Sequence, residues 1–369
     1  MEENGLNLRG EGDHMAKVSD PIVINKTTVK NRITFAPTVK FDMAGADAMV
    51  TEEHIRHYRE RAEGGAGLIC VEATAVEPGG RFAKNHLGFW DDAMIDGHAR
   101  IASACHENGA VVLIQLNHTG ITANPDCGPA IGPSTVETRS GKLSKEMTVA
   151  EIKEMQDLFV NAAIRAKKAG YDGIQLHGCH GYLINQFVNK KTNLRTDEYG
   201  GSAENRARFA SEILKRIRSE CGEDFILSVR TVGADPELAD TIAIAEEYVK
   251  AGCDYLQVSH GMSDAEPGLK KESDPYNTIC AMGVRFHEAF KGRVPTSCVN
   301  SIFEPDQVKY LIENDLTDTV DLARAILADP GFPNAVLNGT PYVRCFECPR
   351  CQYGPFTPHK CPAEKKRTS

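Results

Sequence analysis

The stretch TVAEIKEMQDLFVNAAIRAKKAGYDGIQL (Thr148–Leu176) contains the repeating unit of this chain of 369 residues. Apolar residues recur every three or four positions from Thr148 to Lys168, which predicts an amphipathic helix. Gly170 then ends the helix, and Gly173–Leu176 reads as a short buried strand. The unit is therefore a helix, a glycine stop and a strand.

Seven more short runs rich in β-branched residues occur along the chain, separated by segments of helical length. Together the predicted strands are Ile33–Phe35, Leu68–Glu72, Val111–Leu116, Gly173–Leu176, Phe225–Arg230, Tyr255–Val258, Val294–Val299 and Thr319–Leu322. The predicted helices include Thr51–Glu63, Ile95–Asn108, Thr148–Lys168, Asn205–Glu220, Ile242–Ala251 and Glu304–Glu313. No GxGxxG follows an early strand, as a doubly wound sheet would have. Eight alternating units predict an α/β fold, a (β/α)8 TIM barrel.

The composition excludes several classes of protein. A net charge of −9 argues against nucleic acid or an anionic membrane as the partner, and 41% hydrophobic with 25% charged residues is ordinary globular usage. No run approaches the roughly 18 apolar residues of a membrane span. The polar, acidic start of the chain, Met1–Asp20, lacks the apolar stretch of a signal peptide. We therefore expect a cytoplasmic protein.

We divide the chain into a flexible leader (1–17), a barrel (18–340) and a short cysteine-rich tail (341–369). A barrel of this class needs about 250 residues. Much of the surplus lies in two long segments that follow the third and fourth predicted strands, His118–Met147 and His177–Glu204. Enzymes with this fold place their sites in the loops at the carboxyl ends of the strands.

Polar side chains do stand at those strand ends. Asn300 and Ser301 follow the seventh predicted strand and Arg324 follows the eighth, where barrels of this class commonly bind phosphate. Backbone N–H groups, a hydroxyl and a guanidinium suit a phosphate. An ion pair between Arg324 and a neighbouring aspartate is the alternative.

The segment HGCHGYLINQFVNKKTNLRTDEYGGSAENRARF (His177–Phe209) is the most specific in the sequence. It resembles the Old Yellow Enzyme family of flavin oxidoreductases, in particular the branch that includes 2,4-dienoyl-CoA reductase and trimethylamine dehydrogenase. The resemblance extends over most of the chain, through VKNRITFAP (Val29–Pro37), VEATAV (Val71–Val76), IQLNH (Ile114–His118) and LARAILADP (Leu322–Pro330). It implies a barrel that holds FMN noncovalently at its carboxyl-terminal mouth.

Flavin chemistry asks for two kinds of side chain beside the ring. A cation stabilises the negative charge of the reduced ring, and a carboxamide can bond its pyrimidine edge in both redox states. The resemblance assigns these roles to Arg230 and Gln115. It also sets Pro37, Thr38 and Ala73 along the ring, for which ordinary strand-end packing is the alternative. Ala323, together with Asn300 and Ser301, stands where relatives have glycines near the phosphate, which leaves less room for close backbone approach.

His177 and His180 are three residues apart just after a strand, so both side chains face one side of a turn. Two donors aimed at a carbonyl oxygen would polarise an attached C=C bond, which favours hydride transfer to the β-carbon. Tyr182, with an ordinary pKa near 10, is then available to protonate the α-carbon. The resemblance implies these same roles. A two-histidine metal site is the alternative, and His260 is either a second proton-relay group or a core histidine.

Four cysteines crowd the tail, Cys345, Cys348, Cys351 and Cys361, and the last is followed by Pro362. This spacing fits a [4Fe–4S] cluster or a structural zinc, and the resemblance favours the cluster. Relatives in that branch continue into further flavin- and nucleotide-binding domains. We therefore expect the electrons to come from a separate donor protein or from NAD(P)H that binds directly over the FMN.

The sequence predicts an NAD(P)H:flavin oxidoreductase, an ene-reductase that acts on CH–CH bonds of small unsaturated carbonyl substrates such as enones, enoates or dienoyl thioesters. The alternatives are an amine dehydrogenase and a dehydrogenase that runs in the desaturation direction. An amine site usually needs an aromatic cage, and the chain has a single tryptophan, Trp90, and only 7% aromatic residues. We also expect a homo-oligomer.

Overall fold

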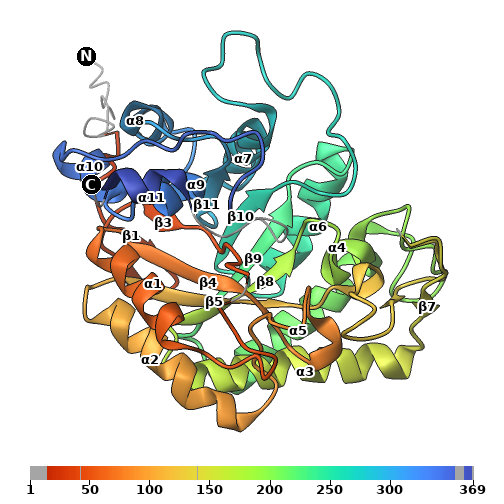
Figure 1. Cartoon of the computed structure of the whole chain (residues 1–369). Helices are drawn as coiled ribbons and strands as arrows, with labels where there is room; N and C mark the ends of the chain where they lie inside the picture. Colours follow the sequence, from red (N-terminus) through yellow and green to blue (C-terminus); the bar gives the residue numbers. More distant parts are fainter. Residues whose placement is uncertain (1–14, 42, 139, 354–360, 368–369) are drawn as a thin grey trace, which may run out of the picture.

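Eight parallel strands close into a barrel at the centre of the molecule, and helices surround it (Figure 1). The computed structural model describes residues 15–41, 43–138, 140–353 and 361–367, so most of the predicted leader and part of the tail lie outside the described residues. Around the barrel the strands follow the order β10-β11-β12-β3-β4-β5-β8-β9. They are β3 (Ile33–Phe35), β4 (Leu68–Ala75), β5 (Val111–Asn117), β8 (Gly173–Gly178), β9 (Ile226–Val232), β10 (Tyr255–Ser259), β11 (Thr296–Val299) and β12 (Thr319–Leu322). The predicted (β/α)8 fold is confirmed.

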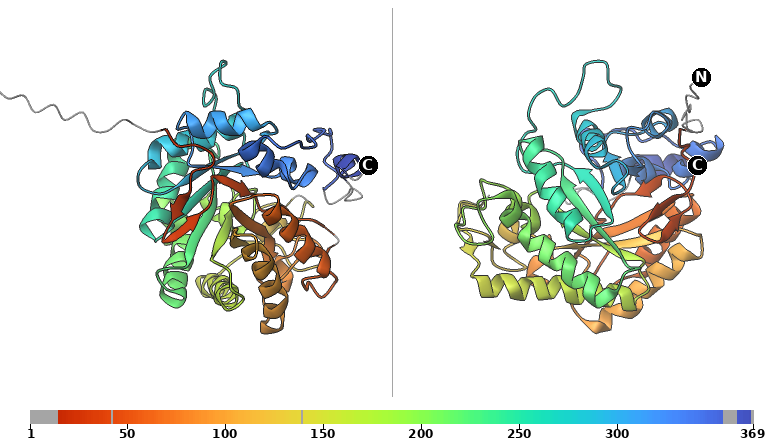
Figure 2. Two further views of the ribbon diagram at one scale, coloured as in Figure 1. Left: turned by 90° about the vertical axis from the view of Figure 1, so that its left-hand side faces the viewer. Right: turned by 180° about the vertical axis from the view of Figure 1, so that it is seen from behind.

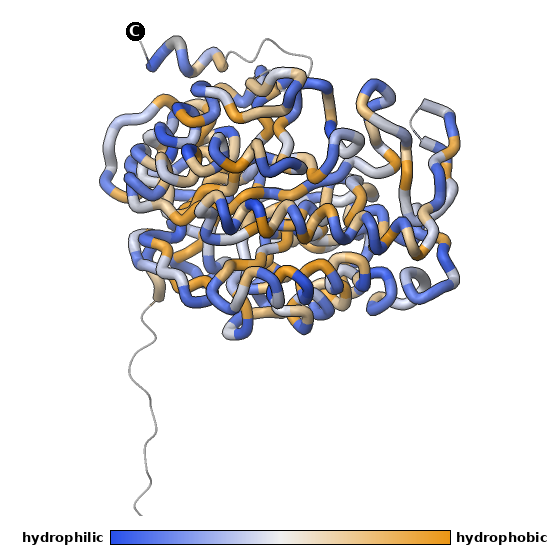
Figure 3. Tube along the Cα trace, turned by 90° about the horizontal axis from the view of Figure 1, so that it is seen from below, coloured by the Kyte–Doolittle hydropathy of each residue, from blue (hydrophilic) through white to orange (hydrophobic). Residues whose placement is uncertain are grey.

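The helices lie outside the strands in both views of Figure 2. Those that cover the barrel are α1 (Glu52–Glu63), α2 (Ile95–His106), α3 (Val149–Lys168), α5 (Ala203–Cys221), α6 (Leu238–Lys250), α7 (Thr278–Phe290) and α8 (Pro305–Glu313). Four short ones are α4 (Leu183–Val188), α9 (Arg324–Ala328), α10 (Phe332–Asn338) and α11 (Pro362–Arg367). Figure 3 shows hydrophilic and hydrophobic residues alternating along the outer helices, as expected for helices with one buried face.

Local chemistry explains where these elements begin and end. Thr148 and Glu151 form a reciprocal capping box at the start of α3, and Gly170 ends it with φ +86°. β11 begins two residues later than predicted, because Pro295 has no N–H to donate to the sheet. Inside α7, Gly283 is required by close packing, since a Cβ there would lie 2.8 Å from the Ser297 carbonyl oxygen of β11.

A hairpin that was not predicted closes the amino-terminal end of the barrel. It consists of β1 (Ile22–Ile24) and β2 (Thr27–Val29). Ile24 and Val29 form a buried cluster with residues at the start of the barrel strands, among them Leu68, Val111 and Ile226. The opposite, carboxyl-terminal end is therefore the end at which a ligand can enter.

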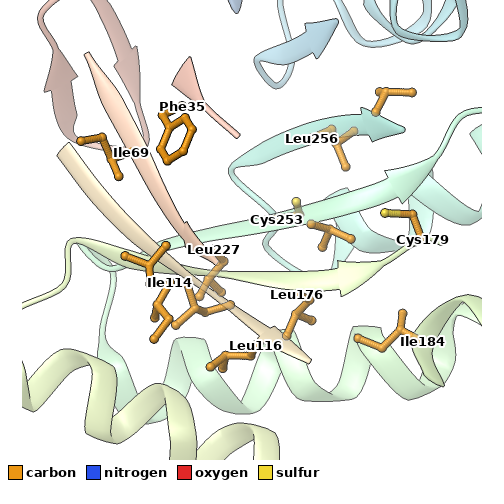
Figure 4. Close-up of a cluster of buried hydrophobic side chains, with 14 of the residues drawn as sticks. Phe35, Ile69, Ile114, Leu116, Leu176, Cys179, Ile184, Leu227, Cys253 and Leu256 are labelled. Carbon is orange, nitrogen blue, oxygen red and sulfur yellow. The ribbon is translucent and has the colours of Figure 1, made fainter. Parts of the chain in front are cut away.

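The main hydrophobic core lies between the barrel and its helices. Figure 4 shows part of it, with Phe35, Ile69, Ile114 and Leu176 drawn from four neighbouring barrel strands. All four side chains are buried completely. Within the described residues, no helix is both long enough and apolar enough to cross a membrane.

Candidate active site at the mouth of the barrel

A cavity of about 230 Å³ opens at the carboxyl ends of five neighbouring strands, β8 to β12. Seven of the residues that the sequence singled out border it: His180, Arg230, His260, Asn300, Ser301, Ala323 and Arg324. They come from segments up to 144 positions apart, between His180 and Arg324. Barrel closure therefore brings five of the nine predicted cofactor-binding residues to a single place.

Arg324 marks the edge of the cavity at the start of α9. Its Nη2 donates to Asn300 Oδ1 at 3.3 Å and to Ser301 Oγ at 3.1 Å, and its guanidinium lies 4.7 Å from the centre of the Phe303 ring. Asn300 and Ser301 have φ values of +88° and +54°, in the region that favours glycine. Among the described residues, the Arg324 side chain makes these two hydrogen bonds, and neither is to an aspartate, which favours the phosphate role over the alternative ion pair.

The two histidines after β8 form a hydrogen-bonded chain. His177 Nε2 and His180 Nδ1 lie 2.9 Å apart, and His180 Nε2 lies 2.8 Å from Ser259 Oγ at the end of β10. His180 adopts φ +63°, and its backbone N–H donates to the His260 carbonyl oxygen at 3.0 Å. A non-glycine residue in this conformation is held there by its surroundings. The His260 side chain lines the cavity as well.

The surroundings of both imidazoles favour their neutral forms. Burial lowers the pKa of His177 well below its usual value, and His180 and Arg230 lower it further. The surrounding protein and Arg230 also lower the pKa of His180, although its ring reaches the open cavity. Neutral imidazoles can donate one hydrogen each without carrying charge.

Tyr182 lies next to this pair, at the N-cap position of α4. Its ring centre is 4.9 Å from that of His177 and 4.7 Å from that of Phe82. The phenol is half-buried between these two rings. The structure thus brings the three predicted catalytic residues together.

Several buried polar atoms around the mouth lack a partner in the described part of the chain. They are His177 Nδ1, Arg230 Nε and both amide atoms of Asn117 at the end of β5. Each of these side chains is at most 6% exposed. A buried polar atom without a partner costs about 1–3 kcal/mol. Such atoms fit a polar, planar ligand such as a flavin ring, which would supply the missing partners.

The sequence pattern of the NADH:flavin oxidoreductase / NADH oxidase family matches residues 17–342. In addition, the chain is 38% identical to an NADPH dehydrogenase from Halalkalibacterium halodurans over 322 residues, which is 86% of this chain and 93% of the relative. The chain belongs to this family. It is therefore an NAD(P)H:flavin oxidoreductase, a flavoprotein that uses FMN.

Solved structures in the family have the same fold. An Old Yellow Enzyme homologue from Zymomonas mobilis superposes with a TM-score of 0.75 at 27% identity, over 89% of this chain and 95% of that one. A 2-naphthoyl-CoA reductase, solved with 2-naphthoyl-CoA, gives 0.82 at 27% identity over 90% of this chain. The match covers 54% of that reductase, so the present chain spans about half its length.

The remaining predicted flavin residues lie on the other arc of the barrel: Pro37 and Thr38 follow β3, Ala73 is in β4 and Gln115 is in β5. The Thr38 hydroxyl donates to the Ala36 carbonyl oxygen at 3.0 Å, just before Pro37. The Ala73 carbonyl oxygen accepts a hydrogen bond from the His86 ring. Gln115 points into the barrel interior and donates to Gln175. None of these four residues borders the 230 Å³ cavity, so their contact with the flavin stays a prediction.

The alternative of a metal site at the histidines has one supporting observation. One potential ligand atom each from His177, Cys179 and His180 lie within 4.8 Å of one another. Cys179, however, directly follows β8 and is buried completely (Figure 4), and burial raises the pKa of its thiol to about 12. A metal ion there would have to displace this proton. The two histidines instead share a hydrogen bond, and His180 also bonds Ser259, so of the two predicted donors only His177 Nδ1 is left for a substrate oxygen.

The four tail cysteines border one small cavity, of about 20 Å³, between α9 and α11. Figure 1 shows α11 and α9 next to each other. Within the described residues no three of these sulfurs lie within 4.8 Å of one another, whereas thiolates around one zinc would lie about 3.8 Å apart. The donor set suits a metal or cluster, but the thiols are not held at ligand positions around zinc.

A second cavity of about 530 Å³ adjoins the first, and the two share His180 and His260. Its walls are largely loop residues, among them Ile121, Thr122, Val136 and Met262. This space lies on the side of the histidines away from Arg324 and is large enough for a small organic substrate.

Sequence reasoning missed three residues that shape the site. Ser259 bonds to His180, Phe82 packs on Tyr182, and Phe303 lies under Arg324. Ser259 carried a usable signal, because it directly follows a predicted strand and precedes His260. The two phenylalanines are in loops, where no periodicity marks them.

Proposed function

We propose that this protein is an FMN-dependent ene-reductase that reduces the C=C bond of an unsaturated carbonyl compound. One observation carries the proposal: a neutral pair of histidines with an unpartnered buried Nδ1 on His177, next to the phenol of Tyr182. A hydrogen-bond donor and an acid side by side are what carbonyl polarisation and α-carbon protonation require.

The cofactor would be held by residues from several strands. Arg324, Asn300 and Ser301 would bind the phosphate, with the Ala323 backbone beside them. Arg230 and Gln115 would contact the polar edge of the ring, and Pro37, Thr38 and Ala73 would line it. FMN, when bound, supplies the hydride that NAD(P)H delivered to it.

The residues of the chain would handle the substrate oxygen and the proton. When Ser259 donates to His180 and His180 donates to His177 Nε2, the neutral His177 carries its hydrogen on Nδ1. That hydrogen would bond to the carbonyl oxygen of the substrate, on which negative charge builds during reduction. Tyr182 would give its hydroxyl proton to the α-carbon and regain it from water.

The tail would hold a [4Fe–4S] cluster on Cys345, Cys348, Cys351 and Cys361, because four thiolates in this spacing suit iron. Zinc remains the competing occupant. A cluster would accept electrons from a separate donor protein. We further predict a homo-oligomer in the cytoplasm, with residues 18–340 as the barrel domain and 341–369 as the tail.

The test is anaerobic purification followed by an absorbance spectrum, analysis of FMN, iron, sulfide and zinc, and turnover with an enone, an enoate and a dienoyl thioester. We expect one FMN per chain and NAD(P)H-dependent or donor-dependent loss of the alkene. Bound FMN with no reduction of any of the three acceptors, but oxidation of an amine, would contradict the proposal.

A further inference from the structure

A row of buried amides crosses the interior of the barrel. Gln115 of β5 donates to Gln175 of β8 (Nε2 to Oε1, 2.7 Å), and Gln175 in turn donates from Nε2 to Gln257 Oε1 of β10. Gln257 donates to Asp321 of β12 (Nε2 to Oδ1, 2.9 Å). All four side chains are at most 2% exposed. The row therefore connects one predicted flavin contact, Gln115, to a carboxylate on the far side of the barrel.

The carboxylate fixes the direction of the whole row. While Asp321 is ionised it can only accept hydrogen bonds, so Gln257 turns its NH2 group toward it, as the structure has it. Its carbonyl oxygen then faces Gln175, and the same constraint passes from Gln175 to Gln115. An amide alone could adopt either of two flipped orientations of the same shape. Asp321 selects the one in which the carbonyl oxygen of Gln115 is turned away from the row.

Asp321 also lies at the candidate active site. It borders the same cavity as Arg230, and Ser297 Oγ donates to its second carboxylate oxygen at 3.0 Å. Burial raises the pKa of Asp321 to about 7, while Arg230 and the hydrogen bond from Ser297 oppose that rise. The carboxylate is thus surrounded by donors and faces the cation expected beside the flavin.

We propose that Asp321, Gln257 and Gln175 are positioning residues that hold Gln115 with its carbonyl oxygen toward the polar edge of bound FMN. The inference rests on the proposed function, which puts Gln115 and Arg230 at that edge. An asparagine at position 321 can donate as well as accept, so the row is free to reverse. It also removes a negative charge near Arg230, which should shift the FMN midpoint potential to more positive values.

The experiment compares Asp321→Asn, Gln175→Met and Ser297→Ala in the full chain. Gln175→Met breaks the row in the middle and leaves the charge. Ser297→Ala removes a different hydrogen bond to the same carboxylate and serves as the matched control. Apo-protein is reconstituted with 15N-labelled FMN, and the ring-nitrogen resonances, the FMN dissociation constant and the midpoint potential are measured.

We expect Asp321→Asn and Gln175→Met to move the pyrimidine-nitrogen resonances and to weaken FMN binding roughly five-fold, the effect of one hydrogen bond. The measurements are made at pH 9, where Asp321 is ionised with or without the Ser297 hydrogen bond. Only Asp321→Asn should then shift the potential strongly, and Ser297→Ala should resemble the wild type. Resonances that stay at wild-type positions in Gln175→Met would overturn the inference, and that variant decides the matter even where Asp321→Asn does not fold. FMN binding by the wild-type protein is measured before that of any variant. Wild-type protein that binds no FMN would contradict the proposed function and not this inference.

Discussion

The barrel mouth and the cysteine tail are both predicted to hold redox groups, but their side chains are held in place to different degrees. At the mouth, His177, His180 and Ser259 are fixed by hydrogen bonds of 2.8 to 2.9 Å between strand ends. In the tail, Cys351 is exposed, the other three cysteines are half-buried, and their sulfurs do not converge in threes.

The difference follows from what each region can use for support. Parallel strands hold the mouth residues through a closed network of backbone hydrogen bonds, so the site exists before its ligand arrives. The tail contributes little core of its own, and a small metal region usually gains its order from the metal. Burial raises the pKa of Cys345 and of Cys361, so cluster binding must also displace protons from these thiols.

Loss of one tail cysteine should therefore have an all-or-none effect on metal. We expect Cys348→Ala to lose nearly all of about four iron atoms per chain while the barrel keeps its FMN and its thermal midpoint. Iron and sulfide analysis with a flavin spectrum measures both. Cys127→Ala, in a loop outside the tail, is the control. Equal loss of FMN would mean that the tail and the barrel mouth form one cooperative unit.

Removal of the acid at the mouth should slow chemistry without loosening structure. Tyr182→Phe should reduce alkene turnover by roughly 10²- to 10⁴-fold, because only the hydroxyl is lost. Flavin reduction by the electron donor should remain close to wild type in stopped-flow experiments. Tyr310→Phe, on the exposed face of α8, should change neither step. A parallel fall of both rates would count against the role of proton donor.

Removal of the Arg324 charge from the predicted phosphate site should have a smaller effect. Arg324→Met removes the charge but keeps much of the side-chain volume over Phe303, so FMN binding should weaken roughly 10- to 100-fold. Equilibrium titration of apo-protein with FMN gives the constant. Arg293→Met, an exposed arginine paired with Glu246, is the control. An unchanged affinity for FMN would show that Arg324 does not bind the phosphate.

The smallest effect concerns the buried histidines of the barrel. Burial lowers the pKa of His98 to about 3, below the ordinary value of 6.5, while its bond to the Gly88 carbonyl opposes the shift. The unfolded chain therefore binds the extra proton first, and the stability that His98 contributes above pH 6.5 is lost as the pH falls toward 3. His98→Gln should flatten the pH dependence of the unfolding free energy there, by at most about 1.4 kcal/mol per pH unit.

His106 serves as a control, because its pKa is shifted in the opposite direction from that of His98. Its hydrogen bond to Asp172, at 2.9 Å, raises its pKa. Its contribution to stability is therefore present below pH 6.5 and lost as the pH rises through the raised pKa. His106→Gln should alter the unfolding curve above pH 6.5 and leave the acid side unchanged. Chemical denaturation at a series of pH values measures both variants. An unaltered acid slope in His98→Gln would show that this ring is not neutral in the folded state.

Much of the fold could be predicted because its signals are local. Glycine stops such as Gly170 and the caps of α3 are read from neighbouring residues. The hairpin β1–β2 was missed because two runs of three residues give too little periodicity, and its role depends on barrel residues far along the chain. The extension of β4 to Ala75 depends on a bulge between Val71 and Thr74, which pairing with β5 determines.

The sequence by itself determined the fold, the family and the chemical identity of the site, since strand-end histidines, arginines and a long motif are visible in the order of residues. Only the tertiary structure decided which of those residues meet. It put Ser259 against His180, joined Arg324 to the two residues that follow β11, and joined Gln115 to Asp321 through two other amides. Those contacts come from barrel closure, which brings residues of distant segments within hydrogen-bond reach.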